Sequence, residues 1–120
     1  MQLPIGVRIR KTRKDPALAS LMKKECEGLE EFNPRITSCK TTLEKEEKSK
    51  LPSGLYRVKA EVTFPPRHKI VVKKEAELNG EPAMLEKLIR ETFEKAGYAI
   101  ERIKEKRLAR IKGHHRKGLE

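Results

Sequence analysis

Alternating apolar and polar positions mark the strands of this protein. The clearest stretch begins at Tyr56 and ends at Phe64, where every second residue is apolar and the residues between them are polar. The same period occurs over residues 5–10, β-branched residues are frequent over 35–46, and apolar positions recur over 69–78. Because successive side chains of a strand point to opposite faces, these segments predict four strands that bury one face of a sheet.

Two other segments carry apolar residues at helical spacing. The first follows Asp15, a typical N-cap residue, and we expect a helix from about Pro16 to Glu31. The second follows a turn, and we expect a long helix from about Pro82 to Arg110. The order of elements is βαβββα. It predicts an α+β fold in which two helices pack on one face of a four-stranded sheet, as in double-stranded-RNA-binding domains.

Length and composition fit one domain with a small core. The chain has 120 residues, of which 36% are hydrophobic and 39% are charged. We expect a single domain at residues 1–112 and a basic flexible tail at 113–120, whose last two residues fit a cloning remnant. No apolar run approaches the roughly 20 residues that span a bilayer, and the start lacks a signal-peptide core. We therefore expect a cytoplasmic protein without a membrane partner.

The charge of the chain is basic and unevenly distributed. Lys and Arg number 29 against 18 Asp and Glu, which gives a net charge of +11. Residues 1–14 are basic without any acid, and residues 101–117 are strongly basic, whereas acidic residues gather in the first helix and after the second strand. Such clusters attract a polyanion, and phosphate contacts of this kind carry little sequence information. An RNA partner recognised by its shape is the first expectation.

The strand alternation places several basic side chains on the sheet face opposite the helices. These candidate RNA-binding residues are Arg8, Arg10, Lys40, Arg57, Lys59 and Lys73. Tyr56 and Phe64 fall on the buried face, so we do not expect bases to stack on the sheet as they do in RNA-recognition motifs.

Other reactive side chains give no catalytic or metal site. Cys26 and Cys39 lack the CxxC spacing of a zinc site, and we expect them to be structural thiols. His68 falls in the turn after the third strand, where an exposed loop residue is expected rather than a general base. The motifs of nucleotide-binding loops, zinc proteases and serine hydrolases are absent from the sequence. We therefore predict a protein that is not an enzyme, with no cofactor, metal or small-molecule substrate.

Four strings of residues, in this order and spacing, give the chain a family resemblance over about residues 5–112. They are Lys14-Asp15-Pro16-Ala17-Leu18, then Leu29-Glu30-Glu31-Phe32 running into Arg35-Ile36-Thr37-Ser38-Cys39-Lys40, then Leu55-Tyr56-Arg57-Val58, and Ile89-Arg90-Glu91-Thr92-Phe93-Glu94-Lys95-Ala96. With them the chain resembles the ribosome hibernation-promoting factors and ribosome-associated inhibitors, also called sigma-factor modulation proteins.

The resemblance implies a ribosome-binding domain that acts by occupancy. Such a domain lodges in the small ribosomal subunit, in the channel for messenger RNA and tRNA anticodon stems, and halts initiation in stressed or resting bacteria. The final helix would present basic residues to ribosomal RNA, and the matching positions are Lys87, Arg90, Lys95, Arg102, Lys104, Lys106 and Arg107. The chain lacks the second, dimerising domain of long family members, so we expect a short-form protein that is a monomer.

Two other functions fit the same sequence. One is a general structured-RNA or ribosomal-RNA-binding protein that does not inhibit translation, since double-stranded-RNA-binding domains also recognise A-form shape. The other is a protein-interaction module that modulates a transcription factor, which predicts an exposed apolar patch rather than clustered basic charge.

Overall fold

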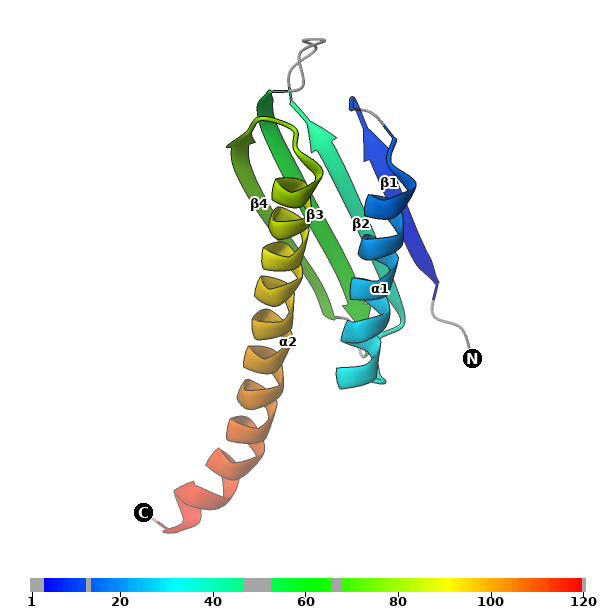
Figure 1. Ribbon diagram of the computed structural model, residues 1–120. Coiled ribbons are helices and arrows are strands. Elements are labelled where there is room, and N and C mark those ends of the chain that lie inside the picture. Colours follow the sequence, from blue (N-terminus) through cyan, green and yellow to red (C-terminus); the bar gives the residue numbers. More distant parts are fainter. Residues whose placement is uncertain (1–3, 13, 47–52, 66–67, 120) are drawn as a thin grey trace.

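The predicted α+β fold is confirmed in a computed structural model (Figure 1). The structure describes residues 4–12, 14–46, 53–65 and 68–119, with side chains as far as Lys106. The elements follow the predicted βαβββα order, and their bounds are β1 Ile5–Arg10, α1 Pro16–Phe32, β2 Ser38–Lys45, β3 Gly54–Phe64, β4 His68–Leu78 and α2 Pro82–Leu119.

The strands lie in the sheet in chain order, β1-β2-β3-β4. β1 and β2 are parallel because α1 connects them, whereas β2, β3 and β4 pair antiparallel. Both helices lie on the same face of the sheet (Figure 1). The opposite face, which we call the open face, is not covered by either helix of the described chain.

The core lies between this sheet and the two helices. Asp15 caps α1, and its Oδ1 accepts a hydrogen bond of 2.9 Å from the backbone N–H of Ala17. The core then contains the inward residues of each strand and the apolar stripe of each helix, among them Met22, Leu43 and Ile89. The predicted inward face of the sheet is therefore confirmed.

A pair of buried thiols joins α1 to β2. Cys26 Sγ and Cys39 Sγ lie 2.7 Å apart, and both cysteines are free and fully buried. The hydrogen bond from Cys39 and the loss of solvent raise the pKa of the Cys26 thiol far above its ordinary value. Both residues act as small apolar groups in the core, as the sequence predicts.

Three local predictions are corrected. β2 begins at Ser38, later than expected. His68 is the first residue of β4 and is half-buried, with its ring centroid 5.2 Å from that of Phe64, so the expected exposed turn position is wrong. The helix predicted to end near Arg110 continues to Leu119, through the segment for which the sequence predicts a tail.

No helix in the described part of the chain combines the length and the apolar character needed to cross a lipid bilayer.

Candidate nucleic-acid interface

Strand register arranges the open face into rows of side chains that run across the sheet. Arg8 lies opposite Thr42, Thr42 opposite Lys59, and Lys59 opposite Lys73. We call these four residues the cationic row. It contains three positive charges and no carboxylate, and within the described residues none of these three side chains has an ion-pair partner. Its charge is therefore available to an external anion.

The next row along the same strands is electrically balanced. It contains Arg10, Glu44, Arg57 and Glu75, in that order across the sheet. Arg10 Nη1 lies 3.8 Å from Glu44 Oε2, and Arg57 Nε donates a 2.7 Å hydrogen bond to Glu75 Oε1. We call these four residues the balanced row.

Two further contacts add to this neutralisation. Glu46 Oε2 lies 3.9 Å from Arg57 Nη2, and Glu44 also lies 4.0 Å from Lys11 Nζ. The hydrogen bond to Glu75 and the surrounding carboxylates raise the pKa of Arg57 above its ordinary value. Arg10 and Arg57, two predicted RNA-binding residues, therefore lie on the open face as predicted but have acidic partners within the protein.

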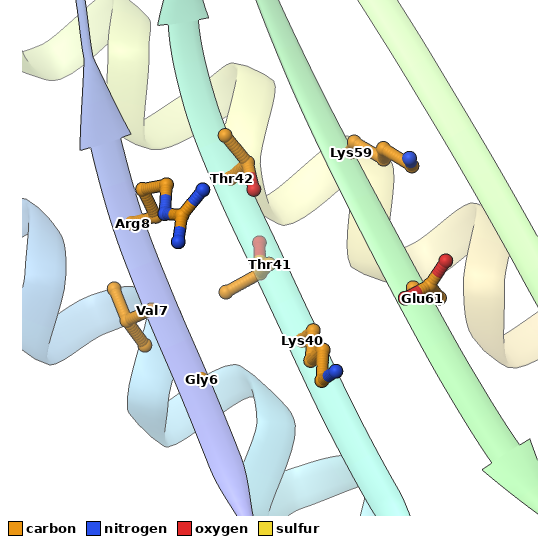
Figure 2. Close-up of a pocket in the computed structure, with 8 residues that line it drawn as sticks. All are labelled: Gly6, Val7, Arg8, Lys40, Thr41, Thr42, Lys59 and Glu61. Carbon is orange, nitrogen blue, oxygen red and sulfur yellow. The ribbon is translucent and has the colours of Figure 1, made fainter.

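A hollow of about 380 Å³ lies between β1, β2 and β3 on the open face. Its lining includes Gly6 and Thr42, which are short, and Arg8, Lys40 and Lys59, which are long and cationic. Figure 2 looks onto this face with the helices behind it, and shows the guanidinium of Arg8 over the gap between β1 and β2, close to Thr42. The hollow is thus a shallow site rimmed by positive charge.

One acid also lines the hollow, and its charge is paired. Glu61 lies opposite Lys40 across the β2–β3 pair, but its Oε1 forms an ion pair of 3.0 Å with Lys69 Nζ on β4. The hydrogen bond from Lys69, with smaller contributions from Lys59 and Lys40, holds the pKa of Glu61 below its ordinary value. Glu61 is therefore an anion whose nearest partner lies on the side away from β2.

The predicted basic residues of α2 form a second surface on the helix layer. Lys95, Arg102 and Lys106 are exposed, and their spacing of seven and four residues puts them on one side of the helix. Lys95 Nζ donates a 3.3 Å hydrogen bond to the backbone oxygen of Lys73, so this side of α2 meets the edge strand β4. Lys95 is therefore the member of this surface that borders the sheet.

The remaining basic residues of α2 are divided between its other sides. Lys87 and Arg90 are exposed, whereas Lys104 is half-buried. Lys104 Nζ lies 3.8 Å from Glu101 and donates a 3.4 Å hydrogen bond to the backbone oxygen of Phe32 at the end of α1. The side chain of Arg107 lies outside the described residues. The predicted set is therefore spread over both faces of the molecule and does not form one patch.

Some residues that line the hollow were not predicted from the sequence as part of the site. Gly6 and Thr42 are uncharged and were not selected, although the strand alternation already puts Gly6 on the same face as Arg8. The pairing of Glu61 with Lys69 depends on the register of the β3–β4 hairpin, which the pattern of apolar residues does not specify to the residue.

Comparison with known proteins gives a family and two neighbours with the same fold. Residues 5–108 match the family of the sigma 54 modulation protein and S30EA ribosomal protein. A ribosomal subunit interface protein from Coxiella burnetii has a similar structure, with a TM-score of 0.65 and 18% identity, covering 85% of this chain and 98% of that one. The N-terminal domain of Thermus thermophilus Protein Y has a TM-score of 0.61 and 15% identity, covering 86% of this chain and 99% of that one. None of the curated proteins matches the chain.

Proposed function

The chain belongs to the family of sigma 54 modulation and S30EA ribosomal proteins, and from this we propose that it binds the small ribosomal subunit and inhibits translation. It would occupy the channel for messenger RNA and tRNA and thereby block initiation. Its activity would be binding rather than catalysis, and its place of action the cytoplasm. We further propose that residues 1–112 are the ribosome-binding unit and that the protein acts as a monomer.

The cationic row is the observation that carries this proposal. It extends over all four strands without an acid, so several phosphates approaching the open face meet unneutralised charge. The predicted residues of α2 add charge on the opposite side of the molecule, with Lys95 beside the β4 edge. A domain with basic surfaces on both sides suits a channel whose walls are RNA. The description of the Coxiella burnetii neighbour as a ribosomal subunit interface protein supports the same location.

Co-sedimentation with separated ribosomal subunits at two salt concentrations tests the proposal. One double variant, Arg8→Gln with Lys59→Gln, removes two charges of the cationic row. Its matched control, Arg10→Gln with Arg57→Gln, removes two charges from the same strands in the balanced row. We expect the first to weaken small-subunit binding by about tenfold or more, as for loss of a charge-assisted hydrogen bond, and the control to weaken it much less.

Translation of a reporter messenger RNA, measured alongside, separates inhibition from binding. We expect the wild-type protein to inhibit, and the cationic-row variant to lose inhibition in proportion to its loss of binding. Binding to free duplex RNA but not to the small subunit would contradict the proposal and would favour the general RNA-binding function. Equal losses in both double variants would show that net charge alone drives binding.

A further inference from the structure

We infer that the hollow on the open face receives one phosphate group of an RNA backbone, an inference that rests on the proposed function. Arg8, Lys40 and Lys59 would supply the positive charge, and the hydroxyl of Thr42 a further hydrogen bond. The hollow thereby fixes the position of the RNA strand on the sheet, whereas isolated surface lysines only attract it.

The shape of the hollow follows from short residues placed between long ones. Neighbouring strands are about 4.8 Å apart, so the backbones of β1 and β3 are separated by roughly 10 Å. Arg8 on β1 and Lys59 on β3 border this space, and Thr42 between them is too short to fill it. Gly6 has no side chain of its own, and the stem of Lys40 lies beside it, since a Cβ added at Gly6 would lie 3.4 Å from Lys40 Cγ. The space open to a phosphate therefore lies over Thr42, between Arg8 and Lys59, with Gly6 and Lys40 in the neighbouring row.

The chemistry of these side chains suits a phosphate oxygen. The guanidinium of Arg8 presents paired N–H donors that match two oxygens of one phosphate, and it has no acidic partner among the described residues. Lys40 and Lys59 are mobile point charges, and in Figure 2 Lys59 leans toward β4 from the far rim. Its long stem allows it to turn toward a bound anion.

The surroundings favour an RNA strand over a free phosphate ion. On one side the cationic row continues to Lys73 on β4. On the other side Arg8 also lines a groove of about 310 Å³ between β1 and the start of α1, together with Lys14 and Asp15. Cations thus follow on both sides of the hollow, where the neighbouring phosphates of a strand would lie.

The Lys69–Glu61 ion pair keeps the hollow cationic. Without Lys69, Glu61 would be free to turn toward Lys40, the residue opposite it, or toward Lys59 on the same strand. Held at 3.0 Å by Lys69, it leaves both lysines available to an anion.

A change of shape without a change of charge gives the sharpest test. Gly6→Val adds an apolar side chain to the lining of the hollow, next to the stem of Lys40, and leaves the net charge at +11. Valine suits a strand, and the backbone of Gly6 is outside the left-handed region. Amide NMR titrations with inorganic phosphate, and separately with a short single-stranded RNA, would follow Gly6 and Thr42. We expect affinity for both probes to fall by about tenfold in this variant, as for one lost charge-assisted hydrogen bond.

Two further variants guard against a folding defect. Arg8→Lys keeps the charge but removes the fork of donors, and we expect a similar loss. Gly28→Ala adds a side chain in α1 at a position where a Cβ meets nothing within 4 Å, and we expect affinities equal to wild type. Circular dichroism would confirm that each variant is folded.

The phosphate and RNA titrations can support or overturn the inference in three ways. Phosphate shifts in the hollow that RNA displaces, and that Gly6→Val weakens, support the inference. Shifts that Gly6→Val and Arg8→Lys both leave unchanged, or no shifts at all, overturn the hollow as a site, while small-subunit sedimentation still decides the proposed function. Phosphate binding that RNA does not displace overturns the assignment to an RNA backbone.

Discussion

The cationic row and the balanced row lie two residues apart on the same four strands, yet they present different charge to solvent. Each has an arginine on β1 and a basic residue on β3. In the balanced row, Glu44 lies between the two arginines, with its Oε2 3.8 Å from Arg10 Nη1. Glu75 lies beside Arg57, with its Oε1 2.7 Å from Arg57 Nε. In the cationic row the corresponding positions are Thr42 and Lys73. The difference therefore comes from the cross-strand neighbours.

This difference shows that the number of basic residues on a face does not measure its attraction for phosphate. An arginine that already has a carboxylate partner releases fewer counterions when RNA approaches, and breaking its ion pair offsets part of the gain. Cross-strand register decides which arginines have a carboxylate partner, so the four predictions below change residues that are cross-strand neighbours.

The largest effect is expected for Thr42→Glu, which places an acid in the middle of the cationic row. The new carboxylate lies between Arg8 and Lys59 and gives both of them an acidic cross-strand neighbour, as Glu44 does in the balanced row. We expect RNA affinity to fall by about ten- to a hundredfold, because like charges brought together in an interface cost several kcal/mol. Fluorescence anisotropy with a labelled RNA would measure it. Thr42→Gln is the control of similar size, and an equal loss in that variant would contradict an electrostatic cause.

Removing one β3 charge from the cationic row and, separately, one from the balanced row should change the salt dependence of RNA binding to different extents. Lys59→Gln removes a free charge, and we expect the slope of log affinity against log salt to decrease by about 0.7 to 0.9, the value for one phosphate contact. Arg57→Gln removes a charge paired with Glu75, and we expect a much smaller change in slope. Salt titrations of RNA binding measure both. Equal slopes in the two variants would show that the two rows do not differ in binding.

A smaller effect in the opposite direction is expected when the balanced row loses its acids. Glu44→Gln with Glu75→Gln removes the ion pair of Arg10 with Glu44 and that of Arg57 with Glu75, and leaves Arg57 only its longer contact of 3.9 Å with Glu46. We expect a modest gain in RNA affinity and a salt slope that is steeper by up to about one unit for each arginine that reaches a phosphate. The same salt titration measures it. An unchanged slope would mean that RNA does not reach this row.

The smallest effect concerns stability and the Glu61–Lys69 pair. Glu61 has its pKa lowered below the ordinary value of 4.5, so its contribution is fully present above pH 4.5 and is lost as the pH falls through the pKa of the folded state. Lys69 is exposed and Glu61 is partly exposed, so the pair is screened by solvent and should contribute less than about 1 kcal/mol. We expect Glu61→Gln to have a slightly lower Tm than wild type near pH 7 and the same Tm near pH 3. A difference that grows on acidification would contradict the sign of this shift.

The fold was predictable because its signals are local and repeated. The strict alternation from Tyr56 to Phe64 and the cap and proline at the start of α1 each specify an element without help from the rest of the chain. Errors arose where tertiary contacts decide the boundary. His68 joins β4 because its backbone pairs with Phe64 across the hairpin, although two prolines before it favoured a turn.

The basic residues of the candidate site could be predicted from the sequence, but which of them have a carboxylate partner could not. Alternation alone assigned Arg8, Lys40 and Lys59 to the open face, and the structure puts them around one hollow. The same alternation assigned Arg57 to that face with equal weight, because the pattern along one strand carries no information on the carboxylate opposite it.

Sequence by itself determined the elements, the buried face of each and the sign of the net charge, since these depend on side-chain period and composition. Tertiary structure alone decided which basic residues remain unpaired, because that depends on the strand register that sets Glu75 beside Arg57 and Lys73 beside Lys59. It also decided that the hollow over Gly6 and Thr42 exists, since two short residues form a site only when longer neighbours from other strands stand around them.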